Sequence, residues 1–479
     1  MAERALDTRT NSSAAGTTCG PVTTLRDWLD RLARRDRLAI ARANVSLTHE
    51  LAAIAKRLDG IQATVFPTPG FAASAVVAGL LSDRHWIADA MGVDEAAMHR
   101  RFQDAVASPL PCREVADAPV QEVVHEHFDL ARLLPIPVHA EFDSGPYITA
   151  GIVITRNPQT GAQNVSINRL QVSGANRLGA LVASRGTGTN FEMAERAGTS
   201  LDVAIVIGVD PLTLLSSQAL ARFDQNELEI AGALHGNPLP VVKCLGSDLR
   251  VPAQAEIVLE GRLLHGVREP EGPFGEFAQY YGTRDDRHVI EIDRVTHRTG
   301  AIFHTILGGG MEHILLGAVP REASILSKLQ WSFPNVQRVH LSNGGVGRFH
   351  LHVQARITHE AEGKNIILGA FATHHDIKQV VVVDDDVDVT RQEQVEWAIA
   401  TRFQSKHDLI LIPESQAAKL DPTARTGVGS KMGLDATKPF GAEEMDFKRI
   451  AIPGEATVDL DNALSAVAAM DWQSALGQA

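Results

Sequence analysis

The sequence predicts a mixed α and β chain in three parts, each with its own pattern of secondary structure. At 479 residues the chain is long enough for about three domains of usual size. Residues 21–115 alternate helix and strand signals, residues 116–319 are dominated by short β-branched stretches, and residues 320–479 are mixed again. We therefore expect an N-terminal α/β segment, a central sheet or barrel and a C-terminal α/β domain, after a loose tail over residues 1–20.

The N-terminal segment is expected to open with a helix after Thr24. Apolar residues recur at helical spacing over residues 25–32, and Asp27 can complete a capping box with Thr24. Arginines on the other side of this helix predict a solvated face. Alternating elements continue to a boundary near Pro109 and Pro111.

The central part reads as short strands separated by Gly, Pro and Asn turns, which favours a sheet or barrel core. The strands are expected at residues 148–155, 164–172, 203–209, 256–259, 288–295 and 301–307.

The last part predicts a helix over 321–329, strands over 350–357 and 379–383, and a helix over 391–402. The uninterrupted apolar run at 380–383 is typical of a strand buried on both faces of a parallel sheet.

Composition excludes several classes of protein. The formal net charge is −13, which opposes binding to nucleic acid or to an anionic membrane surface. No apolar run approaches the roughly 18 residues of a membrane span. The three cysteines are widely spaced and predict neither a disulfide framework nor a zinc ribbon, so we expect a cytoplasmic protein.

The stretch Glu271-Gly272-Pro273-Phe274-Gly275-Glu276 carries the strongest chemical signal. Two glycines and a proline prevent a regular helix, so a tight turn can hold both carboxylates near one pocket. In a dry cleft, one of two adjacent carboxyls stays protonated and can serve as a general acid. A surface turn with solvated acids is the alternative.

A second stretch, residues 164–169, contains an arginine in a strand-like run. If the strand is regular, Arg169 shares a face with Val165 and Ile167. A guanidinium in that position needs an acid or an anionic ligand, and a structural ion pair is the simpler explanation.

Six motifs in order resemble the UbiD family of reversible decarboxylases, over about residues 120–440. They are Asn164 to Arg169, Ile207-Gly208-Val209-Asp210-Pro211, Glu227-Leu228-Glu229-Ile230-Ala231-Gly232, Glu271 to Glu276, Asp384-Asp385-Asp386-Val387-Asp388 and Ser430-Lys431-Met432-Gly433-Leu434-Asp435-Ala436-Thr437. The resemblance implies a flavin-binding split β-barrel joined to a C-terminal α/β oligomerisation domain, in a homo-oligomer that is expected to be a dimer.

The resemblance also implies a cofactor, prenylated FMN, bound with Mn²⁺ or another divalent cation and with K⁺. A flavin prenyltransferase would supply this cofactor, which acts as the electron sink for decarboxylation. By motif match, Arg169, Glu271 and Glu276 form the catalytic network, with Glu276 as the acid. Asn164 and Glu227 are the implied metal ligands. The implied cofactor-binding residues are Asn164, Ser166, Ile167, Asn168, Arg169, Arg185, Gly186, Glu227 and Lys431.

One departure from the family pattern concerns the metal. The family usually supplies a histidine ligand in the stretch that here reads Ser184-Arg185-Gly186-Thr187-Gly188-Thr189-Asn190, and this stretch contains none. Gly186 occupies its place by register. We therefore leave the metal open, and Arg185 is a candidate to offset phosphate charge.

Two other clusters resemble metal sites but are interpreted as structural. The first combines His125, His127 and His139, and the second combines the acids of 384–388 with His374 and His375. Gly-rich stretches at 186–188 and 427–431 match neither the dinucleotide nor the Walker pattern in full.

His313, Arg321 and Arg348 are the candidate substrate residues, because arginines beside a pocket can grip a second acidic group. The expected substrate is a small aromatic or heteroaromatic acid, such as a furan dicarboxylate. Two alternatives stay open: the 4-hydroxy-3-polyprenylbenzoate decarboxylase of quinone biosynthesis, and a non-catalytic flavin-binding member of the family.

Overall fold

The computed structural model describes residues 22–71, 74–182, 185–464 and 472–476. The chain divides into two compact units, residues 1–437 and residues 438–479. The described elements of the second unit are η3 (Glu444–Phe447), α13 (Leu460–Ala463) and α14 (Trp472–Leu476). The predicted tail, residues 1–20, lies outside the described residues. None of the described helices combines the length and apolar character that a membrane span requires.

The predicted first helix is confirmed as α1 (Leu25–Arg34). The Thr24 hydroxyl accepts a hydrogen bond from the Asp27 N–H at 3.0 Å, and the Asp27 carboxylate accepts one from the Thr24 N–H at 3.0 Å. The opposite face is less solvated than predicted. Arg26 donates two hydrogen bonds of 2.9 Å to the buried Glu256, which lies 230 residues away in the sequence.

A four-stranded sheet forms the core of the N-terminal segment. Its order is β1-β2-β3-β16, so the strand predicted at 301–307 exists but joins this sheet and not the central one. Strand β16 pairs in parallel with β3 and forms an edge of this sheet. The elements are β1 (Leu38–Ile40), α2 (Glu50–Arg57), β2 (Ala63–Phe66), η1 (Pro69–Phe71), β3 (Ala75–Ala78), α3 (Arg84–Met91), α4 (Glu95–Ala107) and β16 (Ile302–His304).

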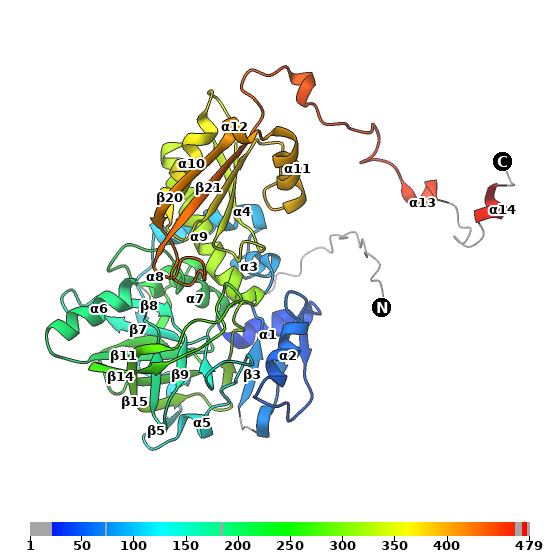
Figure 1. Cartoon of the computed structure of the whole chain (residues 1–479). Coiled ribbons are helices and arrows are strands. Elements are labelled where there is room, and N and C mark those ends of the chain that lie inside the picture. The colour runs from blue at the N-terminus through cyan, green and yellow to red at the C-terminus, as the bar shows by residue number, and fades with distance from the viewer. Residues whose placement is uncertain (1–21, 72–73, 183–184, 465–471, 477–479) are drawn as a thin grey trace. The chain divides into compact units, whose positions relative to one another are not determined.

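The central part is a nine-stranded sheet with the order β6-β9-β10-β15-β14-β11-β7-β8 and with β5 paired to β15 (Figure 1). Its longest pair is the hairpin β14 with β15, of which the predicted strands 256–259 and 288–295 are parts. The strands are β5 (Val123–His125), β6 (Tyr147–Ile148), β7 (Ile152–Arg156), β8 (Gln163–Ile167), β9 (Leu170–Val172), β10 (Arg177–Ala180), β11 (Leu201–Ile207), β14 (Ile257–Glu271) and β15 (Asp285–His297).

The connection from β8 to β9 requires this sheet to curl. The strand predicted over 164–172 is interrupted, and only Asn168 and Arg169 separate β8 from β9. In the sheet order these two strands are six steps apart, which is roughly 29 Å in a flat sheet at about 4.8 Å per strand. The link from Ile167 to Leu170 can span only about 11 Å. The sheet therefore closes on itself, and Arg169 lies at the split.

Shorter elements surround the central sheet. A three-stranded sheet has the order β13-β12-β4. These elements are β4 (Arg113–Glu114), η2 (Pro119–Gln121), α5 (Leu130–Leu133), α6 (Arg185–Arg196), α7 (Pro211–Ser216), α8 (Glu227–His235), β12 (Pro240–Lys243) and β13 (Arg250–Pro252).

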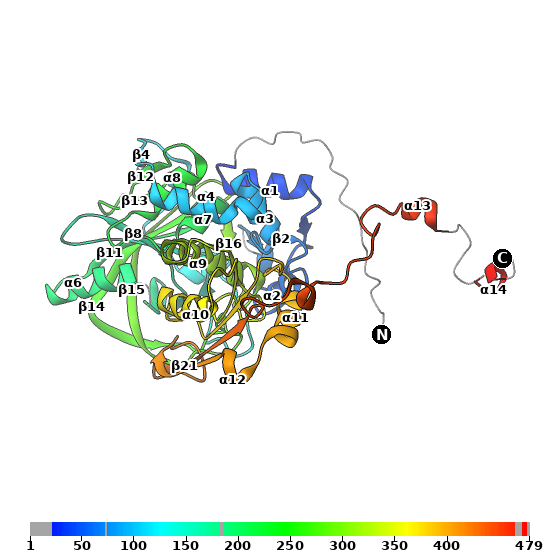
Figure 2. The same cartoon turned by 90° about the horizontal axis from the view of Figure 1, so that it is seen from above.

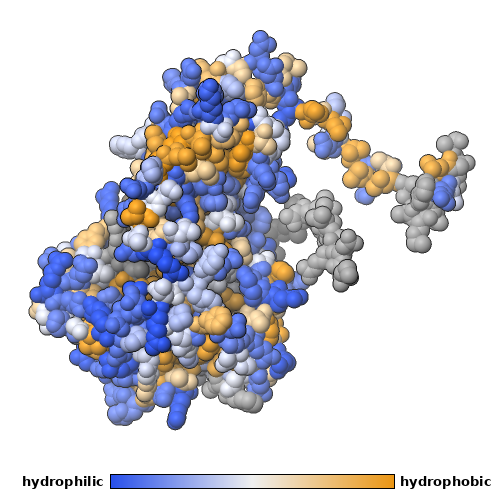
Figure 3. All heavy atoms as spheres, in the orientation of Figure 1, coloured by the Kyte–Doolittle hydropathy of each residue, from blue (hydrophilic) through white to orange (hydrophobic). Residues whose placement is uncertain are grey.

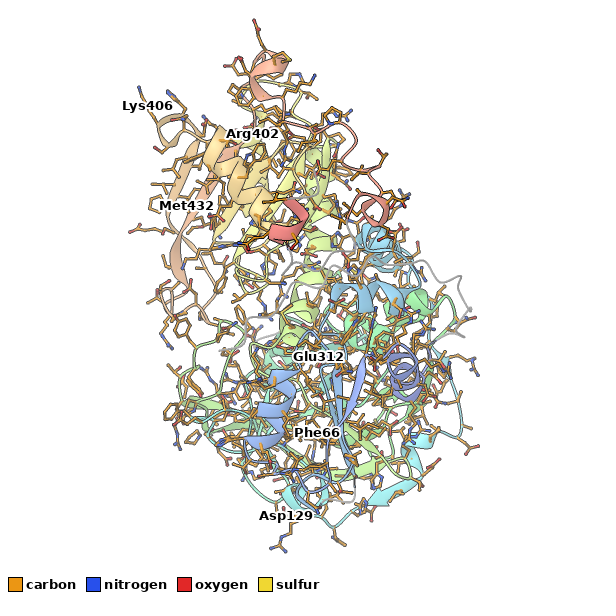
Figure 4. The ribbon with its side chains drawn as sticks, turned by 90° about the vertical axis from the view of Figure 1, so that its right-hand side faces the viewer. Phe66, Asp129, Glu312, Arg402, Lys406 and Met432 are labelled. Carbon is orange, nitrogen blue, oxygen red and sulfur yellow. The ribbon has the colours of Figure 1, made fainter. Side chains whose placement is uncertain are left out.

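The C-terminal part is a five-stranded sheet with the order β17-β18-β19-β21-β20, in which β18, β19 and β21 are parallel. The apolar run of β19 is buried, as predicted. In Figure 4 the labelled Arg402 and Met432 lie in this part. The elements are β17 (Val336–Leu341), β18 (His350–Ala355), α10 (Glu362–Thr373), β19 (Gln379–Val383), α11 (Gln392–Arg402), α12 (Ser405–Asp408), β20 (Leu409–Gln416) and β21 (Val428–Ala436).

Helix α9 (Met311–Ser332) lies between the central and C-terminal parts (Figures 1 and 2). It begins ten residues before the predicted start at 321, because Pro320 is inside the helix and not at its beginning. Buried residues on several sides, including Ile314, Leu315 and Val319, hold the helix continuous through the proline.

Candidate active site

The first unit contains a cavity of about 1290 Å³ between the split of the central sheet and the C-terminal part. Its walls come from the link after β8, the first turns of α6 and α8, helix α9 and the segment that follows α10. The cavity brings together most of the predicted site residues, from the central and C-terminal parts of the chain. Those that line it are Asn164, Ser166, Ile167, Asn168, Arg169, Gly186, Glu227, Glu276, His313, Arg321, Arg348 and Lys431.

The three predicted catalytic residues meet at one wall. Arg169 Nη2 donates to Glu271 Oε2 at 2.8 Å, and Arg169 Nη1 donates to Glu276 Oε1. All three side chains are buried. Glu271 is the last residue of β14, and the turn that follows it carries Glu276 back to the cavity. The turn needs glycine at 272, where φ is +88° and a Cβ would lie 2.8 Å from the Thr283 carbonyl oxygen.

The two acids have different surroundings. Burial raises the pKa of Glu276, although the charges of Arg169 and Arg348 act in the opposite direction. The Oε1 atom of Glu276 takes the contact from Arg169, and Oε2 has no hydrogen bond within the described part of the chain. Glu271 is fully buried and does not line the cavity. Glu276 is therefore the carboxyl placed to hold a proton toward a bound molecule.

Tyr147 completes this cluster and was not predicted. Its hydroxyl donates to Glu271 Oε1 at 3.0 Å, and its ring packs on Phe274 with centroids 4.4 Å apart. The Phe274 ring in turn lies 5.5 Å from the Arg169 guanidinium carbon. The sequence gives no signal for Tyr147, because its pairing with Glu271 depends on strands 124 residues apart.

A second polar cluster forms around the predicted metal ligands. Glu227 Oε1 accepts from Asn164 Nδ2 at 3.2 Å, and Glu227 Oε2 accepts from the Val165 N–H at 2.8 Å. Burial raises the pKa of Glu227 to about 8. No cationic side chain within the described residues lies within 4 Å of this carboxylate. A buried carboxylate beside a carboxamide, with no cation among the described side chains to balance it, fits a site for a hard divalent ion.

The stretch without the expected histidine lies directly against Asn164. A Cβ on Gly186 would collide with the Asn164 side chain, so only glycine fits there with Asn164 in this position. The next residue, Thr187, is buried and donates from its hydroxyl to Asn164 Oδ1 at 3.1 Å. Thr187 was not predicted, and the family pattern pointed to Gly186 alone. The described side chains around Glu227 thus offer amide and hydroxyl oxygens and no imidazole.

The other predicted cofactor residues line the cavity beside these two clusters. Asn168 donates from Nδ2 to the Ser166 hydroxyl at 3.0 Å. Lys431 Nζ donates to the carbonyl oxygens of His375 at 2.9 Å and Ile377 at 2.5 Å. The side chain of Arg185 lies outside the described part of the structure.

The predicted substrate residues form a cationic end of the cavity. His313, Gly317 and Arg321 follow one another at intervals of four along α9, so they face the same way. A Cβ at Gly317 would be 3.2 Å from Arg348 and 3.3 Å from Arg321, which places both guanidiniums over that glycine. The Arg348 guanidinium also stacks on Phe277, 3.9 Å from the ring centroid.

These groups are partly exposed to the cavity but surrounded by protein atoms. Burial lowers the pKa of Arg348 to about 9 and that of His313 to about 3, and it lowers the pKa of Arg321. Neither arginine has a carboxylate within 4 Å among the residues described, although Asp376 acts on both from farther away. Two adjacent guanidiniums without a carboxylate in direct contact can bind an anion.

In the first of the two clusters that were interpreted as structural, His125 and His139 contact different partners. His125 stacks on His297 with centroids 5.1 Å apart, and His139 bonds to Thr305 at 2.7 Å. Asp384 and Asp386 pair with the buried Arg402, so the acidic run is held by an ion pair and not by solvent as predicted. His374 and His375 lie with Asp376, within 4.8 Å of one another, at the cationic end of the cavity.

Three family profiles together match most of the chain. The N-terminal, Rift-related and C-terminal domains of 3-octaprenyl-4-hydroxybenzoate carboxy-lyase match residues 29–106, 113–311 and 314–436. Among curated proteins, the chain is 39% identical over 377 residues to the anhydromevalonate phosphate decarboxylase of Methanothermobacter thermautotrophicus. That match covers 78% of this chain and 88% of the relative.

Two solved structures of one enzyme are also similar. The UbiD-class enzyme HmfF from Pelotomaculum thermopropionicum, in complex with FMN, is 45% identical with a TM-score of 0.90, over 92% of this chain and 100% of that one. An evolved dimeric form of the same enzyme, in complex with prFMN, is 43% identical with a TM-score of 0.87 and the same coverage.

Proposed function

Because the chain belongs to the UbiD family and is a carboxy-lyase, we propose that it decarboxylates a small acid that carries a second anionic group. The observation that carries this proposal is the pair of adjacent guanidiniums, Arg321 and Arg348, at one end of the cavity, neither of which has a carboxylate within 4 Å among the described residues. A substrate held there by its second anion would present its first carboxylate toward Arg169. Our preferred substrates are small aromatic or heteroaromatic diacids, such as a furan dicarboxylate.

Arg169 and Glu276 have different roles at the reacting carboxylate: Arg169 binds the anion and Glu276 donates a proton. Two donors of Arg169 are engaged by the acids, and its buried Nε has no partner among the described atoms, which leaves a donor for an incoming anion. Glu276 holds a proton on Oε2, because Oε1 accepts from Arg169. It would deliver that proton to the carbon that has lost carbon dioxide.

Prenylated FMN supplies the electron sink that an sp² carboxylate needs in order to lose carbon dioxide, which side chains cannot provide. A cavity of about 1290 Å³ lined by Ser166, Ile167 and Asn168 has room for such a ring beside Arg169. The residues we assign to holding the cofactor are those of the link after β8, with Lys431 and the first turn of α6. Arg185 and the implied K⁺ stay predictions.

A divalent metal, Mn²⁺ or another hard cation, is assigned to Asn164 and Glu227. Rotation of the Asn164 amide would turn Oδ1 toward Glu227. The Thr187 hydroxyl, which lies 3.1 Å from Oδ1 in the present orientation, is a third candidate ligand. An all-oxygen set favours Mn²⁺ or Mg²⁺ over the softer metals that imidazole attracts.

A second candidate is an acid with a phosphate as its second anion. The 39% identical relative is named for such a substrate, and paired guanidiniums bind phosphate as well as carboxylate. The long apolar chain of a polyprenylbenzoate has less to support it, because the cationic groups His313, Arg321 and Arg348 occupy this end of the cavity. A non-catalytic role would leave the buried Arg169 and its two acids without a purpose.

The test is decarboxylation by protein produced together with a flavin prenyltransferase. Carbon dioxide release is measured for furan-2,5-dicarboxylate, for furan-2-carboxylate and for a phosphorylated unsaturated acid. We expect one of the two dianionic compounds to exceed the monoacid in kcat/KM by at least about tenfold, which is the contribution of one charge-assisted contact. Equal turnover of the monoacid, or preference for a polyprenylbenzoate, would contradict the proposal.

We also propose that the protein is a homodimer through the C-terminal part. Apolar side chains gather on the outer face of β20 and β21 in Figure 3, and Leu411 and Val428 are 66% and 50% exposed there. Such a patch is typical of an oligomer interface. Light scattering should give a dimer for the wild type and a monomer for Leu411→Lys. The control, Ile40→Lys, changes an equally exposed residue of the N-terminal sheet.

A further inference from the structure

Tyr147 is a fully buried phenol that the catalytic roles above do not use. Tyr147 belongs to strand β6, and its ring packs on the Phe274 ring with centroids 4.4 Å apart. The hydroxyl has three polar neighbours: Glu271 Oε1 at 3.0 Å, Gln171 Oε1 at 3.2 Å and Ser144 Oγ at 3.1 Å. Because a phenol has one proton, the partners of these neighbours decide where that proton points.

The neighbours favour donation to Glu271. The Gln171 oxygen already accepts the Gly272 N–H at 3.0 Å, and the Ser144 hydroxyl can donate to the Tyr147 oxygen. Glu271 then receives a hydrogen bond on each oxygen, from Tyr147 on Oε1 and from Arg169 on Oε2. Two donors and no acceptor around a carboxyl favour its ionised form.

Glu276 lacks this second donor. Arg169 contacts its Oε1, and Oε2 faces the cavity with no donor in the described part of the chain. Other charged groups act on both sides of the pair. Arg348 and Arg169 favour the ionised form of Glu276, while the Glu271 charge and burial favour the protonated form. Asp143, which accepts the Gly275 N–H at 2.9 Å, adds a negative charge near Arg169.

We infer that Tyr147 is a positioning residue that holds the Glu271 carboxylate against Arg169, so that Glu276 is left as the carboxyl that carries the proton. This inference rests on the proposed function, in which Glu276 is the proton donor. Two carboxyls bridged by one guanidinium titrate as a pair, and the share of the proton on each depends on their relative affinities. Of the two acids, the Tyr147 hydroxyl contacts Glu271 alone in the hydrogen bonds of the described residues.

Tyr147→Phe of the loaded enzyme tests the inference through the pH dependence of kcat. Removal of a hydrogen bond to a buried carboxylate changes its proton affinity by about tenfold or more. Glu271 then competes with Glu276 for the proton. Where about nine-tenths of the proton lies on Glu276 in the wild type, a change of about tenfold halves that share, so the plateau of kcat should fall by about twofold, and by more for a larger change. The pair as a whole holds its proton more tightly, so the alkaline decline of kcat should move to higher pH. KM and the cofactor absorption should not change.

The matched control is Tyr281→Phe. The Tyr281 hydroxyl accepts only the Phe142 N–H, at 3.2 Å, and contacts neither acid, so its pH profile should match the wild type. The inference is overturned if the alkaline decline of kcat in Tyr147→Phe stays in place or moves to lower pH. A lower plateau alone does not support it, because a loss of packing lowers kcat without moving the decline to higher pH. Turnover by Glu276→Gln would instead refute the proposed donor, whatever the result for Tyr147.

Discussion

Replacement of Arg321 by methionine separates substrate binding from the proton chemistry of this site. Arg321 Nη1 donates to the Gly317 carbonyl oxygen at 2.6 Å, and its buried Nε has no partner in the described structure. Replacement of Arg348 would be harder to interpret, because its charge also acts on Glu276 and its guanidinium stacks on Phe277. The main influences on the pKa of Glu276 are its burial and the charges of Arg169, Arg348 and Glu271.

The structure predicts opposite effects on stability and on activity. In the free protein Arg321 lies close to a second guanidinium and has no carboxylate within 4 Å among the described residues, although Asp376 acts on it from farther away, and methionine fills a similar volume. Replacement of buried charge by apolar groups is often stabilising by about 1–4 kcal/mol, and we expect the low end because the cavity gives water some access. Toward a dianionic substrate, the loss of a charge-assisted contact costs about 1.5–3 kcal/mol, which is about 10- to 150-fold in kcat/KM.

The assay compares a diacid with its monoacid analogue on wild type, Arg321→Met and Arg321→Lys, with thermal unfolding measured in parallel. Arg321→Met should lose the diacid preference, keep its turnover of the monoacid within about threefold, and unfold at a temperature no lower than the wild type. Arg321→Lys should recover part of the preference, since it keeps the charge but loses the planar fork. Equal losses for both substrates, or a clear drop in the unfolding temperature, would show that Arg321 is structural and refute the reasoning.

Three further predictions concern other groups of the site and its support. Glu276→Gln should abolish turnover and leave the cofactor absorption intact; retained turnover would exclude Glu276 as the acid, and in the wild type kcat should fall as pH rises through the pKa that burial raises. Metal-free protein should lose stability as pH rises from about 4.5 to about 8, because the raised pKa of Glu227 means that the folded protein favours the protonated carboxyl over this range. Glu227→Gln or added Mn²⁺ should flatten this pH dependence of the thermal unfolding temperature. An unchanged pH dependence would contradict the assignment. Arg84→Met should lower the free energy of unfolding by about 3–5 kcal/mol in urea, because it leaves the buried Glu322 without its main partner, whereas Arg196→Met, at an exposed pair, should change it by less than about 1 kcal/mol; similar values for the two would be a contradiction.

The sequence predicted the elements whose signals are local. The capping box at Thr24 and the buried run of β19 depend on neighbouring residues, and both are confirmed. The strand at 164–172 was predicted as continuous, but the sheet must turn at Asn168 and Arg169 to close, which no local pattern indicates. Helix α9 was predicted too short because proline was taken as a start, although buried contacts on several sides stabilise the turns before it.

For the site, the ordered motifs singled out Arg169, Glu271 and Glu276, and the structure brings these three side chains together. Alternation alone placed Arg169 with Val165 and Ile167, whereas the break after Ile167 frees it to reach both acids. Tyr147 and Thr187 were missed, because a lone tyrosine or threonine carries no signal until distant strands place its hydroxyl. The acids at 384 and 386 were predicted to lie in a solvated turn, and their buried partner Arg402 could not be foreseen from a run of charges.

Helix α9 explains how the N-terminal segment can affect substrate choice without touching the cavity. His313 and Arg321 face the cavity, while Glu312 and Glu322 leave the helix on other sides. Glu312 accepts from His304 at 3.1 Å and from the Gly79 N–H at 2.9 Å, at the level of the N-terminal sheet in Figure 4.

Glu322, directly after Arg321, accepts two hydrogen bonds from Arg84, one from the Leu341 N–H at 2.7 Å, and contacts His99 at 2.8 Å. These partners come from α3, α4 and β17, so one buried carboxylate joins three segments beside the substrate residues. A buried acid held by so many donors allows the helix little rotation or translation, since any shift leaves a charge unpaired. The contacts of Glu322 on the other side of the helix thus fix the position of the Arg321 guanidinium. Replacement of Arg84 should therefore lower the preference for the diacid over the monoacid as well as the free energy of unfolding.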